Sequence, residues 1–325
     1  MNVKSGTDLK LRTYQSNANK TNRVKELDQS VLYLGLTSKA GSIADINRKF
    51  LKKSINESSY IELLKHELGS LLWYSAAIST SNDLCLGEIA AENIKFTRDM
   101  FAVNSEIDST QIEILDANYP PKERFPRKII FKFTEQMVEG QTRAALEIVD
   151  AIPNHFPNGP ETLKNGKKQG FKIGESAGEP LTNNSRREDL YRYHDAIHIG
   201  FMAVLGWSPT MRSLLRLKRK SDSHTDDAED GARAIFIEEG LSAILAVHSE
   251  SRMMFEEPVN VDTSIIDIAT TFTKDLEVTR IPSWLWRTAI SKGFKIMTSL
   301  GEHKGGLVTA DLDKRDVTFS ITSGK

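Results

Sequence analysis

The sequence lacks the features of a secreted, membrane or nucleic-acid-binding protein. Its 325 residues include one cysteine, Cys85, which excludes an intramolecular disulfide and a cysteine-built metal cage and suggests a reducing compartment. The 43 basic and 44 acidic side chains nearly cancel, so the net charge of −1 gives no bulk attraction to nucleic acid or anionic membrane. No apolar run approaches the roughly 20 residues of a membrane helix, and because residues 1–20 are polar and have no apolar run that could serve as a signal peptide, we expect none there. We expect a cytoplasmic protein without membrane or nucleic-acid partners.

The length of the chain and its apolar periodicity predict more than one domain. A chain of 325 residues exceeds what a single hydrophobic core usually serves. With 39% apolar and 27% charged residues, its composition is that of a globular protein. Apolar residues recur at spacings of three and four over residues 27–53, 58–81 and 86–100, which indicates three amphipathic helices. Because the connections between them are short and polar, we expect an antiparallel bundle.

The middle of the chain has a different composition. Half of the ten prolines lie between Pro120 and Pro157, and proline interrupts helices. Apolar and polar residues alternate over residues 129–133, which predicts a strand, and a short strand is also expected at residues 171–173. We therefore expect residues 104–183 to form an irregular connector with short strands.

Helical periodicity returns in the last part of the chain. We expect helices at residues 187–205, 207–220, 230–248, 261–277 and 284–300, and then a hairpin of residues 308–311 and 317–321. The predicted fold class is mainly α, with a helical bundle at residues 20–103 and a second helical domain with a few short β-strands at residues 184–325.

Three segments near the N-terminus resemble a known enzyme family. Residues 34–49 (LGLTSKAGSIADINRK), 67–74 (ELGSLLWY) and 84–98 (LCLGEIAAENIKFTR) resemble the MazG-type nucleoside triphosphate pyrophosphohydrolases, which have an all-α fold. Members of that family carry GEAGE on the first helix and ELGD on the second. Two acids at i and i+3 share a helix face, and two such pairs on antiparallel helices bring four carboxylates together. That oxygen cage suits Mg²⁺, which bridges the phosphates of the substrate and activates a water molecule.

In this chain the predicted N-terminal cage is degenerate. Lys39 and Ser42 stand at the positions of the first acidic pair, and Ser70 replaces the aspartate of the second pair. Only Glu67 remains, so the charge of the four positions is 0 where the family has −4. One carboxylate beside an ammonium group is a poor site for a divalent cation. We therefore expect the bundle to keep the fold and to have lost the chemistry.

A second group of residues lies in the C-terminal half. Residues 178–184 (GEPLTNN), 191–209 (YRYHDAIHIGFMAVLGWSP) and 229–248 (EDGARAIFIEEGLSAILAVH) resemble the C-terminal domain attached to some MazG-like proteins, over roughly residues 115–320.

The acids and histidine of these segments have the composition of a metal site. Asp195 and His198 are three residues apart on a predicted helix, while Glu238 and Glu239 interrupt an otherwise apolar one. Buried carboxylates are costly unless a metal, an arginine or solvent compensates them. We predict Asp195, His198 and Glu238 as ligands of Mg²⁺ or, because of the histidine, of Mn²⁺. Glu238 or Glu239 is the predicted catalytic group that orients the attacking water.

Two alternatives to this metal site remain at this point. An Asp–His hydrogen bond, together with a glutamate paired to Arg192 or Arg233, would satisfy the same groups structurally. The adjacent His194 and Asp195 are also similar to the pair that names the HD phosphohydrolases, although the additional spaced His and Asp of that family are not evident.

A run of cations follows the predicted site helix. Arg212, Arg216, Lys218 and Lys220 are candidate ligands of a triphosphate, because a metal alone rarely neutralises that much charge. The run also includes Arg219. The alternative is a solvated helix end that faces the acidic loop of residues 222–230.

These observations lead to two hypotheses. The first is a metal-dependent nucleotide pyrophosphohydrolase, with its chemistry in the C-terminal half, that releases a nucleoside monophosphate and pyrophosphate from an NTP or dNTP. The second is a non-catalytic nucleotide sensor or scaffold derived from the same family, which the degenerate cage favours. The resemblance also implies a homo-oligomer, a dimer, because family members assemble through such helices.

Overall fold

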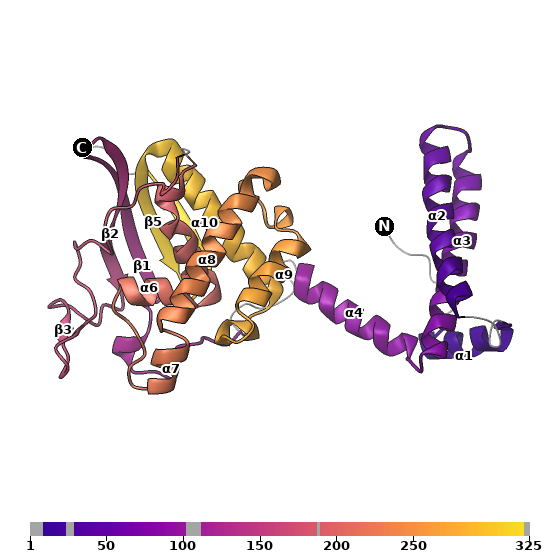
Figure 1. Ribbon diagram of the computed structural model, residues 1–325, viewed down its shortest axis with the longest axis horizontal. Helices are drawn as coiled ribbons and strands as arrows, with labels where there is room; N and C mark the ends of the chain where they lie inside the picture. The colour runs from indigo at the N-terminus through magenta and orange to yellow at the C-terminus, as the bar shows by residue number, and fades with distance from the viewer. Residues whose placement is uncertain (1–8, 24–28, 102–111, 187–188, 322–325) are drawn as a thin grey trace. The chain divides into compact units, whose positions relative to one another are not determined.

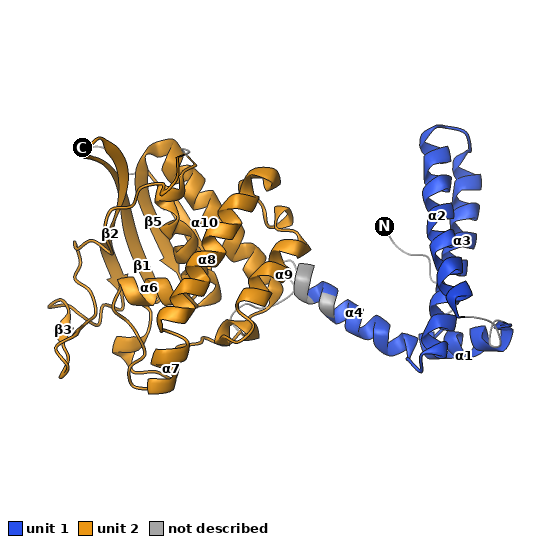
Figure 2. Ribbon diagram, viewed as in Figure 1, with its two compact units in different colours: residues 1–98 blue, residues 99–325 orange. Residues whose placement is uncertain are grey.

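The computed structural model describes residues 9–23, 29–101, 112–186 and 189–321. The chain divides into two compact units, residues 1–98 and residues 99–325 (Figure 2). The fold is mainly helical with a small antiparallel sheet, as the sequence predicted. None of the described helices combines the length and the apolar content that crossing a membrane requires.

The first unit contains the three predicted helices and one more. Helices α2 (Ser30–Leu51), α3 (Glu57–Ser81) and α4 (Leu86–Phe101) confirm the predicted segments. Helix α1 (Leu11–Thr21) was missed, because its short apolar face is small beside its many polar residues.

Helices α2 and α3 form an antiparallel hairpin, and α1 packs against α3 (Figure 1). The indole nitrogen of Trp73 on α3 donates to Thr21 of α1 at 2.9 Å. Helix α4 meets α1 at its own first turn, where Gln15 accepts from the backbone N–H of Leu86 at 2.8 Å. The predicted third member of the bundle is therefore replaced by α1. The described part of α4 leaves Ile94 about half exposed.

The hairpin of α2 and α3 leaves much of its apolar surface uncovered. Its exposed large apolar side chains are Val31, Tyr33, Leu34, Leu51, Ile61, Leu63, Leu68 and Leu72. The small buried cluster of this unit consists of Ala18, Ala76 and Leu86, with Leu11, Tyr14 and Trp73 packed against it. So small a core is a weak basis for a stable monomeric unit.

The second unit is built on a four-stranded antiparallel sheet in the order β2-β1-β5-β6. Its strands are β1 (Lys128–Val138), β2 (Gln141–Ile152), β5 (Gly305–Asp311) and β6 (Asp316–Ser320). The predicted closing hairpin is β5 and β6. The predicted connector at residues 104–183 instead supplies β1 and β2 to this sheet, with Phe131 of β1 opposite Val308 of β5.

A smaller hairpin lies outside the sheet. Strand β3 (Glu161–Thr162) pairs with β4 (Lys168–Gln169). The strand predicted at residues 171–173 is not formed, and the expected short strand lies just before it, as β4.

The helices of the second unit follow the predicted order. They are α5 (Asp195–Gly200), its π-helical continuation η5 (Phe201–Leu205), α6 (Pro209–Leu214), α7 (Ser223–Ala228), α8 (Ala232–Ser249), α9 (Thr263–Phe272) and α10 (Ser283–His303). A short 3₁₀ turn, η4 (Tyr191–Tyr193), precedes α5. Residues 187–188, where the first of these helices was predicted to begin, lie outside the described residues.

Close packing buries the whole of helix α5. Helices α5 and α10 meet at two glycines: a Cβ on Gly200 would lie 2.9 Å from the carbonyl oxygen of Ala289, and one on Gly293 would lie 2.9 Å from the Cα of Ile197. Helix α10 in turn packs on β5 and β6, and α8 packs on α5 and α6. Every residue of α5 is buried, including its two polar members, Asp195 and His198.

Candidate metal centre

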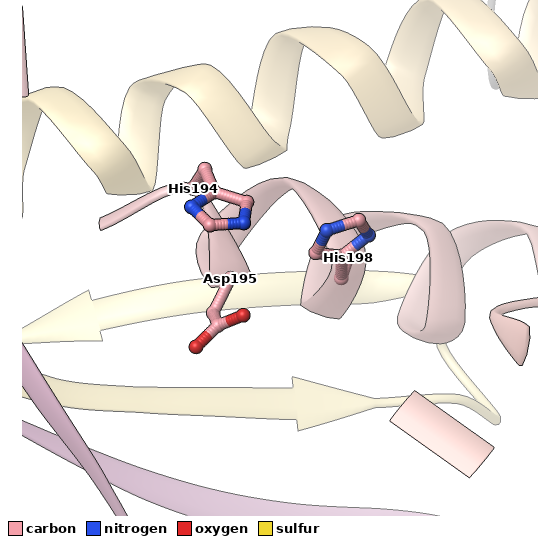
Figure 3. Close-up of side chains that lie close together, drawn as sticks. All are labelled: His194, Asp195 and His198. Atoms are coloured by element: carbon pink, nitrogen blue, oxygen red, sulfur yellow. The ribbon is translucent and has the colours of Figure 1, made fainter. Parts of the chain in front are cut away.

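Three polar side chains meet at the start of α5 (Figure 3). His194 lies at the junction of η4 and α5, and Asp195 and His198 lie on the first turns of α5. One ligand atom of each residue lies within 4.8 Å of the others, and all three residues are buried. Two imidazoles and a carboxylate are a ligand set suited to a divalent transition metal.

Each histidine is held by its Nδ1 atom. Nδ1 of His194 lies 2.8 Å from the carbonyl oxygen of Tyr191, and Nδ1 of His198 lies 2.8 Å from Oε1 of Glu238. A carbonyl oxygen only accepts hydrogen bonds, so Nδ1 of His194 carries a proton and donates it to Tyr191, and Nε2 is left on the side of Glu239. This is how proteins orient metal-binding histidines.

The surroundings of Nε2 of His198 test whether these residues suit a metal ion. Within the described residues this buried atom has no hydrogen-bond partner. The carboxylate of Asp195 also accepts no hydrogen bond from any described residue, although its side chain is only 7% exposed. Buried polar atoms are almost always paired, so a buried Nε2 atom without a hydrogen-bond partner, close to the carboxylates of Asp195 and Glu239, fits a cation as its partner.

The two glutamates of α8 have different environments. Glu238 is fully buried and accepts hydrogen bonds from the Ser208 hydroxyl at 2.6 Å and the Thr210 N–H at 2.8 Å, in addition to its contact with His198. Its oxygens are thus occupied, and it orients His198. The side chain of Glu239 is 39% exposed, and its Oε2 lies 3.5 Å from Nε2 of both His194 and His198.

The structural alternative to a metal site required a glutamate of α8 to pair with Arg192 or Arg233, and the described residues do not form either pair. Arg192 pairs with Glu135 at 2.9 Å. Among the described residues, neither Arg192 nor Arg233 forms an ion pair with Glu238 or Glu239. His194, which the sequence analysis did not count as a ligand, completes the cluster instead. Its adjacency to Asp195 was the available signal.

The carboxylates and imidazoles perturb one another's protonation. Burial alone would lower the pKa of His198, but Glu238 and Glu239 raise it to about 10. Burial raises the pKa of Asp195. Burial also opposes ionisation of Glu239, yet its contacts with His194 and His198 hold its pKa well below the usual range. Without a metal, the cluster therefore keeps a proton on His198 at neutral pH.

Metal affinity should consequently rise with pH. An ion that takes Nε2 of His198 must displace a proton held with a pKa of about 10, so the proton and the metal compete. We expect Mn²⁺ to bind about tenfold more tightly per pH unit between pH 6.5 and 8.5, with about one proton released per ion. Calorimetry in buffers of different ionisation enthalpy measures both quantities. An affinity that does not change with pH would contradict this assignment.

The predicted phosphate ligands are divided between the core and a pocket. Arg212 is buried, and its guanidinium donates to the carbonyl oxygen of Glu123 at 2.8 Å and pairs with Asp116 at 3.1 Å. It therefore has a structural role that the sequence did not predict. Arg219 is likewise buried and pairs with Asp230 at 2.8 Å.

The remaining three cations line a pocket of about 330 Å³. The pocket is lined by Arg216, Lys218 and Lys220. Lys168, the first residue of β4, and Lys167, which precedes that strand, line it as well. The other lining residues are Ser213, Asp226 and Asp227, so cations outnumber acids by five to two. Arg216 pairs with Glu175, whereas none of the four lysines has an ion pair with a described residue. Lys167 and Lys168 lie 44 or more positions before the run in the sequence, and for that reason the sequence analysis missed them.

Two of the four degenerate N-terminal positions, Lys39 and Glu67, are in contact, and the four hold no acidic pair. Nζ of Lys39 on α2 lies 3.1 Å from Oε2 of Glu67 on α3. Ser42 and Ser70 each donate to a carbonyl oxygen one turn earlier in their own helix. The ammonium group thus neutralises the single remaining carboxylate.

The comparisons with known proteins agree with the C-terminal resemblance. The family model of the MazG C-terminal domain matches residues 160–323, which include the histidines, Asp195, both glutamates and the cationic pocket. The N-terminal resemblance is not matched separately. No curated protein and no solved structure matches the chain.

Proposed function

The chain belongs to the MazG C-terminal domain family, and from this premise we propose that it is a metal-dependent nucleotide pyrophosphohydrolase whose reaction takes place in its second unit. Membership in a MazG-related family supports a nucleotide-related function in general. The observation that carries the finer proposal is the pair of imidazoles that lie beside the carboxylate of Asp195, with their Nδ1 atoms fixed and their Nε2 atoms 3.5 Å from Glu239.

His194, Asp195 and His198 would hold the ion, and two imidazoles with one carboxylate suit Mn²⁺ better than Mg²⁺, which prefers oxygen ligands. When bound, such an ion polarises phosphoryl oxygens and lowers the pKa of a coordinated water. Glu238 keeps the ring of His198 in place through its three hydrogen bonds. Glu239 is the carboxylate with solvent access, and it lies beside both histidines, so it is placed to orient the attacking water.

The cationic pocket would bind the phosphates of the substrate. Lys218 and Lys220 have no acidic partner among the described residues, so a polyphosphate would meet charges that are not already neutralised. Helix α6 connects the two sites: Thr210 at its start lies 3.4 Å from Glu239, and Ser213 one turn later lines the pocket.

The test is an assay of the purified full-length chain with Mg²⁺ or Mn²⁺ against a panel of NTPs and dNTPs. We expect equal amounts of nucleoside monophosphate and pyrophosphate from at least one of them. If no pyrophosphate is released across the panel, the proposal fails. Nucleotide binding that persists in EDTA without turnover would favour a sensor or scaffold, the role that the neutralised pair of Lys39 and Glu67 suggests for the first unit.

We also propose that the chain is a dimer through the first unit. Ile61, Leu68 and Leu72 form an exposed apolar stripe at helical spacing on α3. The double variant Leu68→Glu/Leu72→Glu is expected to halve the mass measured by light scattering, from twice 36.4 kDa to 36.4 kDa. Met137→Glu changes an exposed apolar residue of the second unit, 69% exposed against 50% for Leu68 and 39% for Leu72, and should leave the dimer intact. A monomeric native protein, or a dimeric double variant, would contradict this.

A further inference from the structure

A second cavity, of about 650 Å³, adjoins the candidate metal centre. The two share Tyr191, whose ring lines the cavity and stacks on the ring of His194 with centroids 4.3 Å apart. The hydroxyl of Tyr191 lies 3.3 Å from that of Ser242, which in turn donates to the backbone carbonyl of Glu239. A molecule in this cavity is thus separated from the cluster by a single aromatic ring.

The lining of this cavity is unsuited to phosphate. Its walls include the apolar side chains of Leu190, Ala246 and Met297. Two acids, Asp189 and Glu250, lie among the lining residues, and none of the lining residues that the structure describes is a lysine or an arginine. Such a lining gives a phosphate no described cation to bind, and it accepts an uncharged group with apolar faces and N–H donors at its edge. In both charge and polarity it is the opposite of the cationic pocket.

One polar atom in the lining lacks a partner. Oγ1 of Thr298 on α10 is buried and forms no hydrogen bond with any described residue. The hydroxyl of Thr288 on the same helix donates to the carbonyl of Trp284 at 3.0 Å, which is the usual arrangement for a helical threonine. A hydroxyl group both donates and accepts, so Thr298 can pair with either kind of group on a ligand.

We infer that this cavity binds the nucleobase of the substrate, with Thr298 bonded to the polar edge of the ring. This inference rests on the proposed function. It concerns the nucleobase, which is the uncharged part of a nucleotide that a pocket lined by cations does not suit. A nucleotide carries a flat, uncharged, polar-edged ring at one end and several negative charges at the other. The second unit offers one cavity for each, and both have contacts that lead to the same cluster.

Three variants test the inference. Ala243→Trp places a bulky ring at an exposed lining position of α8. Phe236→Trp is its control, because Phe236 is 75% exposed on the same helix and does not line the cavity. Thr298→Val removes the unpaired hydroxyl and keeps the size of the side chain. Because that hydroxyl forms no hydrogen bond with any described residue, its removal should not lower the stability of the protein.

The readout is calorimetric binding of AMP, GMP, CMP and UMP, with hydrolysis of NTPs and of inorganic triphosphate measured in parallel. We expect the native chain to bind at least one monophosphate. Ala243→Trp should weaken that binding more than tenfold, and Thr298→Val about three- to tenfold with an unchanged melting temperature. Phe236→Trp should leave binding unchanged. Triphosphate carries no base, so its hydrolysis should not respond to Ala243→Trp.

The outcomes separate this inference from the proposed function. Base-dependent binding that is lost in Ala243→Trp, in a protein that hydrolyses no nucleotide, would keep the base pocket and reject the hydrolase. Pyrophosphate release with a KM unchanged in Ala243→Trp would keep the hydrolase and reject the pocket. Absence of monophosphate binding by the native chain, or an equal loss in Phe236→Trp, would also overturn the inference.

Discussion

Asp195→Ala is expected to abolish pyrophosphate release and to leave the protein folded. The carboxylate of Asp195 is buried, and it accepts no hydrogen bond from a described residue that the substitution would leave unpaired. Burial raises its pKa, which means that its charged form is unfavourable in the metal-free protein. Removing it should therefore leave the melting temperature unchanged or slightly higher. The rate should fall by roughly a thousandfold, the upper range for losing one group of a preorganised site.

Initial rates at saturating Mn²⁺ and thermal melts without metal check this prediction. Asp195→Asn is the matched control, since it keeps the shape of the side chain and loses its charge, and it should be nearly as inactive as Asp195→Ala. If Asp195 instead has a structural role, the alanine variant will melt several degrees lower and its remaining activity will follow the folded fraction.

Glu238→Ala is expected to have the largest effect on stability of any single change in the site. Its fully buried carboxylate accepts hydrogen bonds from Ser208 and Thr210 and holds His198. Truncation leaves those groups unpaired in the core, and breaking a buried charged pair costs about 3–5 kcal/mol. Chemical denaturation of the metal-free protein measures this change.

The neighbouring residue provides the control. Glu239 is 39% exposed, so Glu239→Ala should lower the free energy of unfolding far less while it removes the activity. We thus expect the Glu238 variant to lose mainly stability and the Glu239 variant to lose mainly activity. Equal stability losses in the two variants would show that Glu238 does not have the orienting role assigned to it.

Part of the candidate site could be predicted because it rests on local spacing. Asp195 and His198 were found from their separation of three residues, and Glu238 and Glu239 from their place in an apolar helix. Adjacent helical residues point about 100° apart, so different roles for the two glutamates could be expected, but which of them would hold His198 could not be predicted. It depends on Ser208 and Thr210, which meet α8 only because α6 packs against it.

The cationic run shows another limit of sequence analysis. A charge pattern does not reveal which partners the fold will bring to it. Arg212 and Arg219 enter the core because Asp116 and Asp230 are buried there with them. Strand β2 was missed for a different reason: its segment (QTRAALEIVDAI) is rich in alanine, leucine and glutamate, which favour helix, and only its pairing with β1 makes it extended.

The location of the metal is the central claim, and anomalous X-ray scattering from a crystal soaked in Mn²⁺ with a non-hydrolysable nucleotide tests it most directly. The predicted result is a peak within bonding distance of Nε2 of His194, Nε2 of His198 and the carboxylate of Asp195, with none beside Lys39 and Glu67. A peak beside Glu67 with none in the second unit would contradict it.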